Sequence, residues 1–288
     1  MKQLIVTADD FGAAREVNDA VERAYEDGIL TAASLMVAAP AAADAVTRAK
    51  ALSLPVGLHL VLVEGRPVLP AAAIPDLVDA DGFFRTDMVL AGAAMFFLPK
   101  MRRQLAAEIE AQFKAFAATG LPLDHVNAHK HFHLHPTIAA LTLRIGRRFG
   151  LNAMRVPYEP AGMLRQIEPK TGRSIVVETW ARRLRKRLAA AGVFSPDRVF
   201  GLAWSGAMTP ARLQGLLRQL PDGVTEIYLH PATAAEFSLA APGYQYKAEL
   251  TALVSQEVID IAKKNKIQRG AFRDFLPPAK NLKVITAH

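Results

Sequence analysis

The sequence of 288 residues contains no cysteine, which excludes disulfide bonds, thiolate metal ligands and a cysteine nucleophile. It also lacks the glycine-rich sequences of phosphate-binding loops and the G-x-S-x-G sequence of many serine hydrolases. No apolar run reaches the roughly 20 residues of a membrane span. The amino terminus enters a strand-like run directly, so we expect no export signal and a cytoplasmic protein.

Charge and hydropathy limit the possible partners. The net charge is +8, and 51% of the residues are hydrophobic, which is ample for a core. A basic protein is attracted to anionic surfaces such as phospholipid or nucleic acid. No nucleic-acid-binding motif is present and the charge is not interleaved with aromatic residues, so nucleic acid is not an expected partner.

Strand-like and helix-like segments alternate along the chain, which indicates parallel βαβ units. The predicted strands are Leu4–Ala8, Ala33–Val37, Val56–Leu62, Leu123–His129, Asn152–Val156, Val199–Ala203, Val224–His230 and Ile267–Phe272. The predicted helices are Arg15–Asp27, Ala41–Leu52, Met88–Leu98, Met101–Thr119, Pro136–Phe149, Ile175–Ala191, Pro210–Leu220 and Lys247–Lys264. Long loops are expected at Glu64–Asp87, Pro157–Gly172 and Pro231–Tyr246.

This order predicts an α/β fold, an irregular or incomplete (β/α) TIM-like barrel, formed by a single domain. The domain is expected to span residues 1–276, and residues 277–288 are expected to form a C-terminal tail. An open doubly wound sheet is the alternative.

The stretch Asp124–Pro136, DHVNAHKHFHLHP, holds five of the eight histidines. Neutral imidazole is the commonest protein ligand for metal ions. In an extended segment, alternate histidines from His129 onwards would share one face. In a helix, His129 and His133 would lie one turn apart. The simpler alternative is a hydrogen-bonded polar cluster without a metal.

Polar residues also follow the other predicted strands. They are Asp9 and Asp10 after the first strand, His59 in the third, Arg155 at the end of the fifth, Trp204 after the sixth and His230 at the end of the seventh. The carboxyl ends of barrel strands carry the active site. Each residue alone has a structural explanation, for instance an Asp as a helix cap or a histidine in the core; their joint occurrence favours a site.

One aspartate and two histidines would leave coordination positions open for water and a substrate carbonyl. The second carboxylate could accept the proton of the water, and an imidazole across the site could protonate a leaving amine. The pattern therefore predicts metal-assisted hydrolysis.

Four motifs together resemble the YdjC-like carbohydrate deacetylase family. They are TADDFG from Thr7, GLH from Gly57, NAHKHFHLHP from Asn127 and LHP from Leu229. The resemblance implies a barrel-like fold and removal of an acetyl group from an N-acetylglucosamine-type sugar with one divalent metal ion.

Carried onto this sequence, the resemblance implies Asp10, His59 and His129 as metal ligands. It implies Asp9 as the catalytic base and His230 as the acid, and the roles of Asp9 and Asp10 could be exchanged. We expect Arg155, Trp204, His131 and His133 to contact the substrate. The ligand set suits Zn²⁺ by softness, whereas the family is associated with Mg²⁺.

The tract NAHKHFHLHP, with Lys130 inside it, is most similar to the hopanoid-biosynthesis (HpnK-type) branch, which implies a lipid-linked hopanoid glycoside as substrate. The apolar segment Met88–Leu98 and the basic segment Ile175–Ala191 suit the boundary of an anionic membrane. Peripheral contact with the inner face of the membrane is therefore expected, and a homodimer is left open. The competing functions are another metal-dependent amidohydrolase or phosphoesterase and a non-enzymic nucleic-acid-binding protein.

Overall fold

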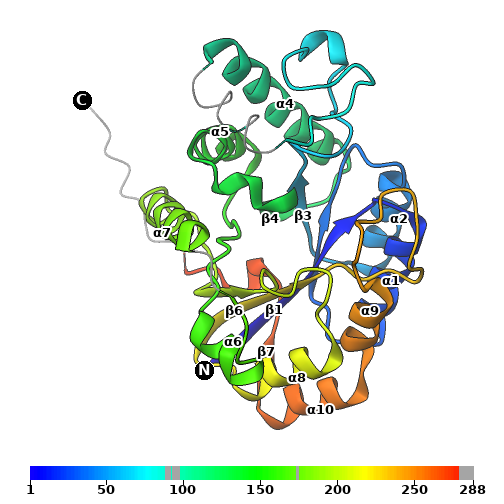
Figure 1. Cartoon of the computed structure of the whole chain (residues 1–288), viewed down its shortest axis with the longest axis vertical. Helices are drawn as coiled ribbons and strands as arrows, with labels where there is room; N and C mark the ends of the chain where they lie inside the picture. Colours follow the sequence, from blue (N-terminus) through cyan, green and yellow to red (C-terminus); the bar gives the residue numbers. More distant parts are fainter. Residues whose placement is uncertain (88–91, 93–97, 173–174, 279–288) are drawn as a thin grey trace.

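A computed structural model describes residues 1–87, 92, 98–172 and 175–278. Seven parallel strands make a curled sheet, and helices lie around its outside (Figure 1). The strand order is β4-β3-β2-β1-β6-β5, and β7 pairs with the first residues of β1. Within the described ranges, no helix combines the length and the apolar character needed to cross a membrane.

The strands are β1 Lys2–Phe11, β2 Ala32–Leu35, β3 Val56–Leu60, β4 Leu123–Ala128, β5 Arg198–Phe200, β6 Gly223–Leu229 and β7 Gln268–Arg269. The helices are α1 Arg15–Glu26, α2 Ala42–Leu52, α4 Pro99–Ala118, α5 Pro136–Gly146, α6 Ala161–Ile167, α7 Ile175–Ala190, α8 Pro210–Arg218, α9 Tyr246–Val254 and α10 Gln256–Lys264. Short 3₁₀ turns are η1 Ala71–Ala73, η2 His129–Leu134, η3 Arg147–Phe149 and η4 Phe272–Phe275.

Helix α1 shows how the sequence specifies these units. Val17, Val21 and Ala24 recur at helical spacing and are buried against the sheet. Asn18 lies on the same face, where its side chain accepts a hydrogen bond from the Gly12 amide and donates one to the carbonyl of Ala41. The loop after β1 is thereby held to the start of α2.

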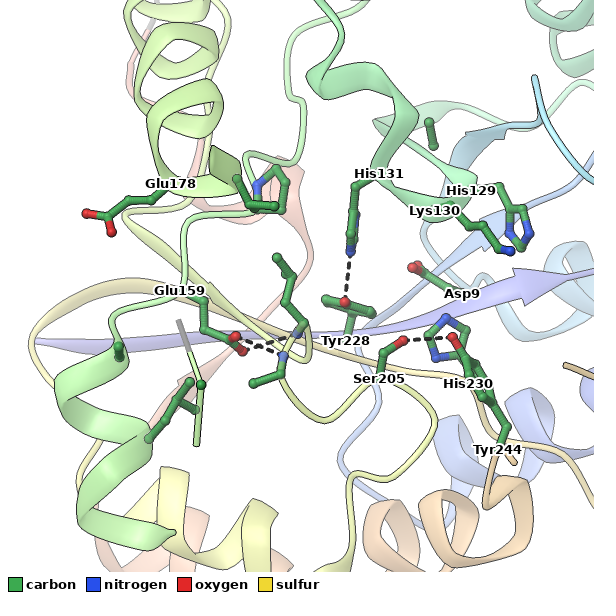
Figure 2. A pocket seen from close by; sticks show the side chains of 18 of the residues that line it. Asp9, His129, Lys130, His131, Glu159, Glu178, Ser205, Tyr228, His230 and Tyr244 are labelled. Atoms are coloured by element: carbon green, nitrogen blue, oxygen red, sulfur yellow. Dashed lines mark hydrogen bonds between the residues drawn. The ribbon is translucent and has the colours of Figure 1, made fainter. Parts of the chain in front are cut away.

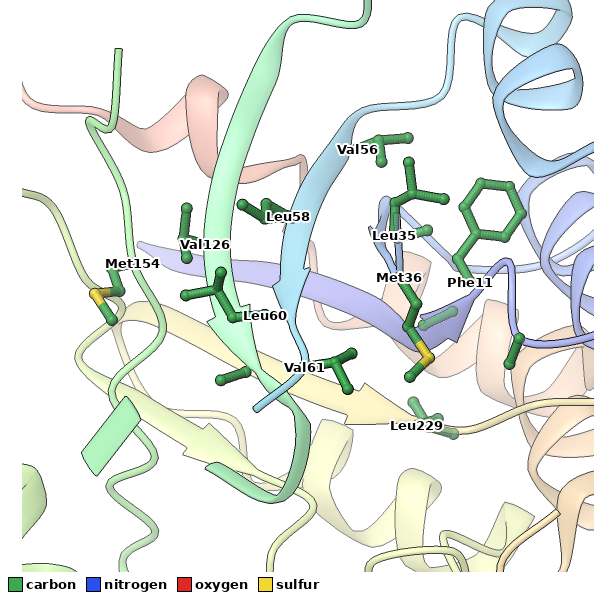
Figure 3. Close-up of a cluster of buried hydrophobic side chains, with 14 of the residues drawn as sticks. Phe11, Leu35, Met36, Val56, Leu58, Leu60, Val61, Val126, Met154 and Leu229 are labelled. Atoms are coloured by element: carbon green, nitrogen blue, oxygen red, sulfur yellow. The ribbon is translucent and has the colours of Figure 1, made fainter. Parts of the chain in front are cut away.

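The main core lies between the sheet and the helices. Figure 3 shows Phe11, Leu35, Leu58, Val126 and Leu229 in this core, all fully or almost fully buried. Because all the strands are parallel, their carboxyl ends meet at one edge of the sheet.

The sheet curls like half of a barrel, and no regular ladder in the described part of the chain joins β4 to β5. The predicted strand Asn152–Val156 is reduced to isolated bridges, which pair Met154 with Val126 and Ala153 with Phe194. The prediction of an irregular or incomplete (β/α) arrangement is confirmed. A closed barrel is not observed in the described part of the chain.

Several predicted elements need correction. The loop predicted at Pro157–Gly172 contains α6, and the single helix predicted at Lys247–Lys264 is two helices because the backbone of Ser255 is extended between them. The strand predicted at Val199–Ala203 ends at Phe200, because the Glu159 carboxylate accepts the next three backbone N–H groups. The helix predicted at Met88–Leu98 and the tail from residue 279 lie outside the described residues.

The histidine tract is neither extended nor α-helical, which corrects both alternatives for its geometry. Strand β4 ends at Ala128, and Lys130 and His131 adopt left-handed backbone conformations inside η2, with φ of 51° and 54°. This reversal separates the imidazoles, so that they do not line one face.

Candidate metal centre and active site

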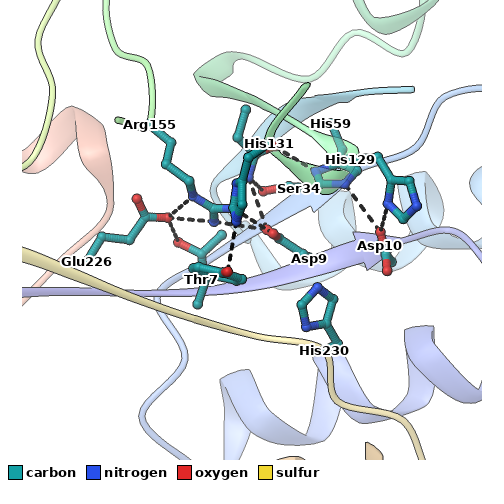
Figure 4. Close-up of polar contacts among 12 residues, drawn as sticks. Thr7, Asp9, Asp10, Ser34, His59, His129, His131, Arg155, Glu226 and His230 are labelled. Carbon is teal, nitrogen blue, oxygen red and sulfur yellow. Dashed lines mark hydrogen bonds and ion pairs between the residues drawn. The ribbon is translucent and has the colours of Figure 1, made fainter. Parts of the chain in front are cut away.

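Three predicted ligands converge at the carboxyl edge of the sheet. Asp10 comes from the end of β1, His59 from β3, and His129 directly follows β4. The Oδ1 atom of Asp10 is 3.2 Å from His59 Nε2 and 3.2 Å from His129 Nδ1 (Figure 4). One ligand atom from each residue lies within 4.8 Å of the others, as a shared cation requires.

The backbone of β1 explains why Asp10 and its neighbour face different ways. The register between β1 and β2 shifts between Ala8 and Phe11, and Asp10 has a left-handed φ of 60°. A bulge of this kind re-aims a side chain. Asp10 therefore meets the two histidines, while Asp9 turns towards Arg155 (Figure 4).

The donor set fits a divalent cation. His59 Nδ1 lies 2.7 Å from the amide oxygen of Asn127, so this nitrogen carries a proton and, in the neutral ring, Nε2 carries the lone pair. That Nε2 is buried and has no hydrogen-bond donor among the described residues. Burial alone would raise the pKa of Asp10, but His129 outweighs it and holds the pKa well below its ordinary range.

Asp9 belongs to a buried network rather than to the triad. Arg155 donates to Asp9 Oδ2 at 2.5 Å and to Asp9 Oδ1 at 2.9 Å, and also to Glu226 Oε1 at 2.8 Å. Thr7 donates to the same oxygen of Glu226 at 3.0 Å. Burial would raise the pKa of Asp9, but the charge of Arg155 outweighs it and holds the pKa far below the ordinary value, so Asp9 is ionised.

His230 follows β6 and faces the same space as Asp9 and Asp10 (Figure 4). Its ring packs edge-on against Tyr228 and Tyr244, at centroid distances of 5.7 and 5.1 Å. Its backbone amide donates to the buried carboxylate of Glu249, whose pKa is raised by burial. The imidazole is thus held in place while its Nδ1 has no hydrogen-bond partner among the described residues.

Asp9, His59, His129 and His230 line a cavity of about 630 Å³ (Figure 2). Its polar lining includes Asp9, His59, His129, Lys130, His131, Glu159, Glu178, Ser205, Tyr228, His230 and Tyr244. Its apolar lining includes Leu164, Val177 and Leu202. Such a volume lies within the usual range of a small-molecule site.

Of the four residues expected to contact substrate, His131 lines this cavity. Its Nε2 lies 2.8 Å from the hydroxyl of Tyr228, and burial, reinforced by the charge of Arg155, holds its pKa well below the ordinary value. The other three are buried and contact protein partners. His133 bonds the carbonyl of Arg155, and Trp204 donates to Glu168. Arg155 has 0% exposure because it neutralises two carboxylates, which places it behind Asp9 rather than in the cavity.

Sequence reasoning missed several residues of the site. Tyr228 lies two positions before His230 on β6, so the period of two in a strand could have indicated it. Asn127 lies two positions before His129, so the same period of two could have indicated it. Tyr244 comes from the loop before α9 and had no local signal in the sequence.

Comparisons with known proteins give a consistent picture. A family model described as YdjC-like protein matches residues 3–264. A carbohydrate deacetylase of Geobacillus stearothermophilus is 30% identical over 276 residues, covering 94% of this chain and 97% of that protein. A carbohydrate deacetylase of Mus musculus is 32% identical over 255 residues, covering 84% of this chain and 78% of that protein.

Among solved structures, a putative cellobiose-phosphate cleavage protein of Enterococcus faecalis has a TM-score of 0.74 at 24% identity, covering 96% of this chain and 99% of that one. A lactam utilization protein of Thermus thermophilus has a TM-score of 0.52 at 16% identity, covering 93% and 99%. At these identities the likeness concerns the fold alone.

Proposed function

The chain belongs to the YdjC-like protein family, and we propose that it is a metal-dependent deacetylase that hydrolyses the acetamide group of an N-acetylated sugar. The observation that carries the proposal is the convergence of Asp10, His59 and His129 beside an ionised Asp9. The relatives named carbohydrate deacetylases support the choice of substrate class.

In this proposal Asp10, His59 and His129 hold one divalent ion, Mg²⁺ or Zn²⁺. When bound, the ion supplies the Lewis acidity that polarises an acetyl carbonyl and acidifies a water molecule. Among the described residues only one such triad was found, which favours a single-ion hydrolase over a two-metal phosphoesterase.

Asp9 acts as the base. Arg155 and Asn127 occupy three of its roughly four acceptor positions, which leaves one lone pair of Oδ2 unused in a residue that lines the cavity. This lone pair accepts a proton from the attacking water while the water oxygen bonds to the acetyl carbon. Arg155 and Asn127 prevent the carboxylate from turning away.

His230 acts as the acid. It lines the cavity, and Tyr228 and Tyr244 limit the orientation of its ring. As the C–N bond breaks, the imidazolium gives its proton to the sugar nitrogen, so that acetate and a free amine leave. Solvent then removes the proton from Asp9 and returns one to His230. We propose that His131 contacts the substrate from the cavity wall.

We extend the proposal to a lipid-linked substrate, a hopanoid glycoside, as the resemblance to the hopanoid-biosynthesis branch implies. Ile175 and Val176 begin α7 with exposures of 69% and 66%, and the next residue, Val177, lines the cavity. The exposed arginines Arg182 and Arg183 lie further along the same helix. An apolar edge beside cationic side chains favours peripheral contact with an anionic membrane.

The test is acetate release by the full chain from a chitooligosaccharide and from an N-acetylglucosaminyl glycolipid. We expect activity that is lost with EDTA and restored by a divalent ion, and that is higher on the glycolipid. Activity that EDTA leaves unchanged would refute the proposed dependence on a metal ion. Equal rates on the two substrates, together with no flotation on anionic vesicles, would refute the lipid-linked substrate and leave the deacetylase standing.

A further inference from the structure

A series of buried hydrogen bonds runs from Asp124, near the start of β4, to His59 of the metal triad. It passes through four side chains that the proposed chemistry does not use directly. They are Asp124, His125, Ser34 and Asn127, with exposures of 5%, 0%, 0% and 0%. Buried polar groups persist when each has a partner, and a complete network specifies one arrangement of its members.

This series of hydrogen bonds begins at Asp124. Its carboxylate accepts the backbone N–H groups of Phe272 and Arg273 at 3.3 and 3.1 Å, and faces His125 Nδ1 at 2.9 Å. Burial alone would raise the pKa of Asp124, but these hydrogen bonds outweigh it and lower the pKa. An ionised carboxylate only accepts, so His125 carries its proton on Nδ1.

The His125 ring has little freedom to move. It stacks on Phe272 with a centroid distance of 4.1 Å and an interplanar angle of 16°. On its other side lies Gly57, where an added Cβ would come within 2.5 Å of the ring. The Nε2 of His125 is 3.0 Å from the hydroxyl of Ser34, and in the neutral ring this nitrogen accepts the Ser34 proton. Both lone pairs of the Ser34 hydroxyl remain available to accept hydrogen bonds.

Asn127 is the last side chain in this series of hydrogen bonds, and its partners determine the orientation of its amide. Its Nδ2 donates to Ser34 Oγ at 2.8 Å and to Asp9 Oδ1 at 3.0 Å. Asp9 is ionised by its pairing with Arg155 and can only accept, so the nitrogen end must face it. The amide oxygen then faces His59 Nδ1 at 2.7 Å.

We propose that Asn127 is a positioning residue that serves two groups of the active site. Its amide oxygen determines which nitrogen of His59 is free for the cation, and its amide nitrogen orients Asp9 as an acceptor. The side chains of Ser34, His125 and Asp124 align that amide from behind. The inference rests on the proposed function, because it assumes that His59 holds a cation.

The two ends of the amide can be tested separately. Asn127→Leu removes both ends, so we expect the affinity for Zn²⁺, measured by calorimetry on the full chain, to fall about 10- to 100-fold. Asn127→Asp keeps an acceptor for His59 but loses the donor to Asp9. Its Zn²⁺ affinity should stay at the wild-type value or tighten, while kcat for deacetylation falls about 10- to 100-fold.

Ser34→Ala tests the supporting residues. Without the hydroxyl, the Asn127 amide loses one of the two partners that hold its nitrogen end. We expect the affinity of this variant for Zn²⁺, measured by calorimetry on the full chain, to fall, but by less than that of Asn127→Leu. Thr142→Val is the matched control, because the Thr142 hydroxyl is buried with no hydrogen-bond partner among the described residues. This control should bind Zn²⁺ like the wild type.

The outcomes separate the two proposals. A wild-type chain that binds no divalent ion would overturn the proposed function. A wild type that binds Zn²⁺ while Asn127→Leu binds it equally well would overturn this inference alone. If Asn127→Leu does not fold, Asn127→Asp, which keeps the size of the side chain, decides: loss of Zn²⁺ affinity in that variant contradicts a role for the amide oxygen.

Discussion

Replacing Arg155 by methionine tests the buried charge network that supports Asp9. The arginine has 0% exposure and pairs with Asp9 and Glu226, whose side chains are also almost fully buried. Removing one partner of a buried ion pair leaves charge without compensation and costs about 3–5 kcal/mol. For a chain of this size that corresponds to a fall in Tm of at least about 6 °C.

Arg148→Met is the matched control. Arg148 is 56% exposed and pairs with Glu110 at the surface, where solvent screens an ion pair and its contribution to stability is small. Thermal and urea unfolding of both variants, followed by circular dichroism, measures the difference. Equal destabilisation of the two variants would refute the account of Arg155.

The pH dependence of Arg155→Met provides a second measure. In the wild type, the pKa of Asp9 is lowered because Arg155 outweighs burial. In the variant, burial is opposed only by the smaller effects of His59 and His230, so we expect it to raise that pKa above its unfolded value. The folded state then binds more protons than the unfolded state between the two pKa values, so the free energy of unfolding must fall as pH rises through that window. A variant whose stability is independent of pH there would contradict this reasoning.

Three further predictions concern single side chains. Asp9→Asn should retain Zn²⁺ binding in calorimetry but lower kcat at least about 100-fold, because the base is lost; loss of Zn²⁺ binding instead would assign Asp9 as a ligand. Burial would raise the pKa of Asp124, but the hydrogen bonds to its carboxylate lower this pKa below the ordinary 3.8. The contribution of Asp124 to stability is therefore present above pH 3.8 and is lost as the pH falls. Asp124→Asn should therefore lose stability less steeply below about pH 4 in acid unfolding than the wild type does, and an identical acid limb would exclude this contribution. Gly57→Ala should lower the free energy of unfolding by about 1–3 kcal/mol, because its Cβ would meet the His125 ring; an unchanged Tm would show that the ring can move.

Sequence reasoning recovered what depends on local pattern. Alternating strands and helices predicted parallel units, and parallel strands place residues such as Asp10, His59 and His129 at one edge. The periodicity of a strand and the position of its end depend on neighbouring residues. The convergence of these three residues could therefore be predicted, although they lie far apart in the sequence.

Other features depend on contacts between distant segments and could not be read locally. The backbone of Lys130 and His131 is left-handed, which reverses the direction of the histidine tract. No residue preference in the sequence predicts this reversal. The burial of Arg155 follows from its pairing with Asp9 and Glu226 on neighbouring strands, which the residues around Arg155 do not indicate. The orientation of Asn127 likewise depends on partners from three separate strands.

The most direct test of the central claim is anomalous diffraction at the zinc edge from crystals of the full chain soaked in Zn²⁺. The account predicts one strong peak at about 2.0–2.2 Å from a carboxylate oxygen of Asp10, from His59 Nε2 and from His129 Nδ1. A peak held by His131, His133 or His135, or no peak between Asp10 and the two histidines, would contradict it.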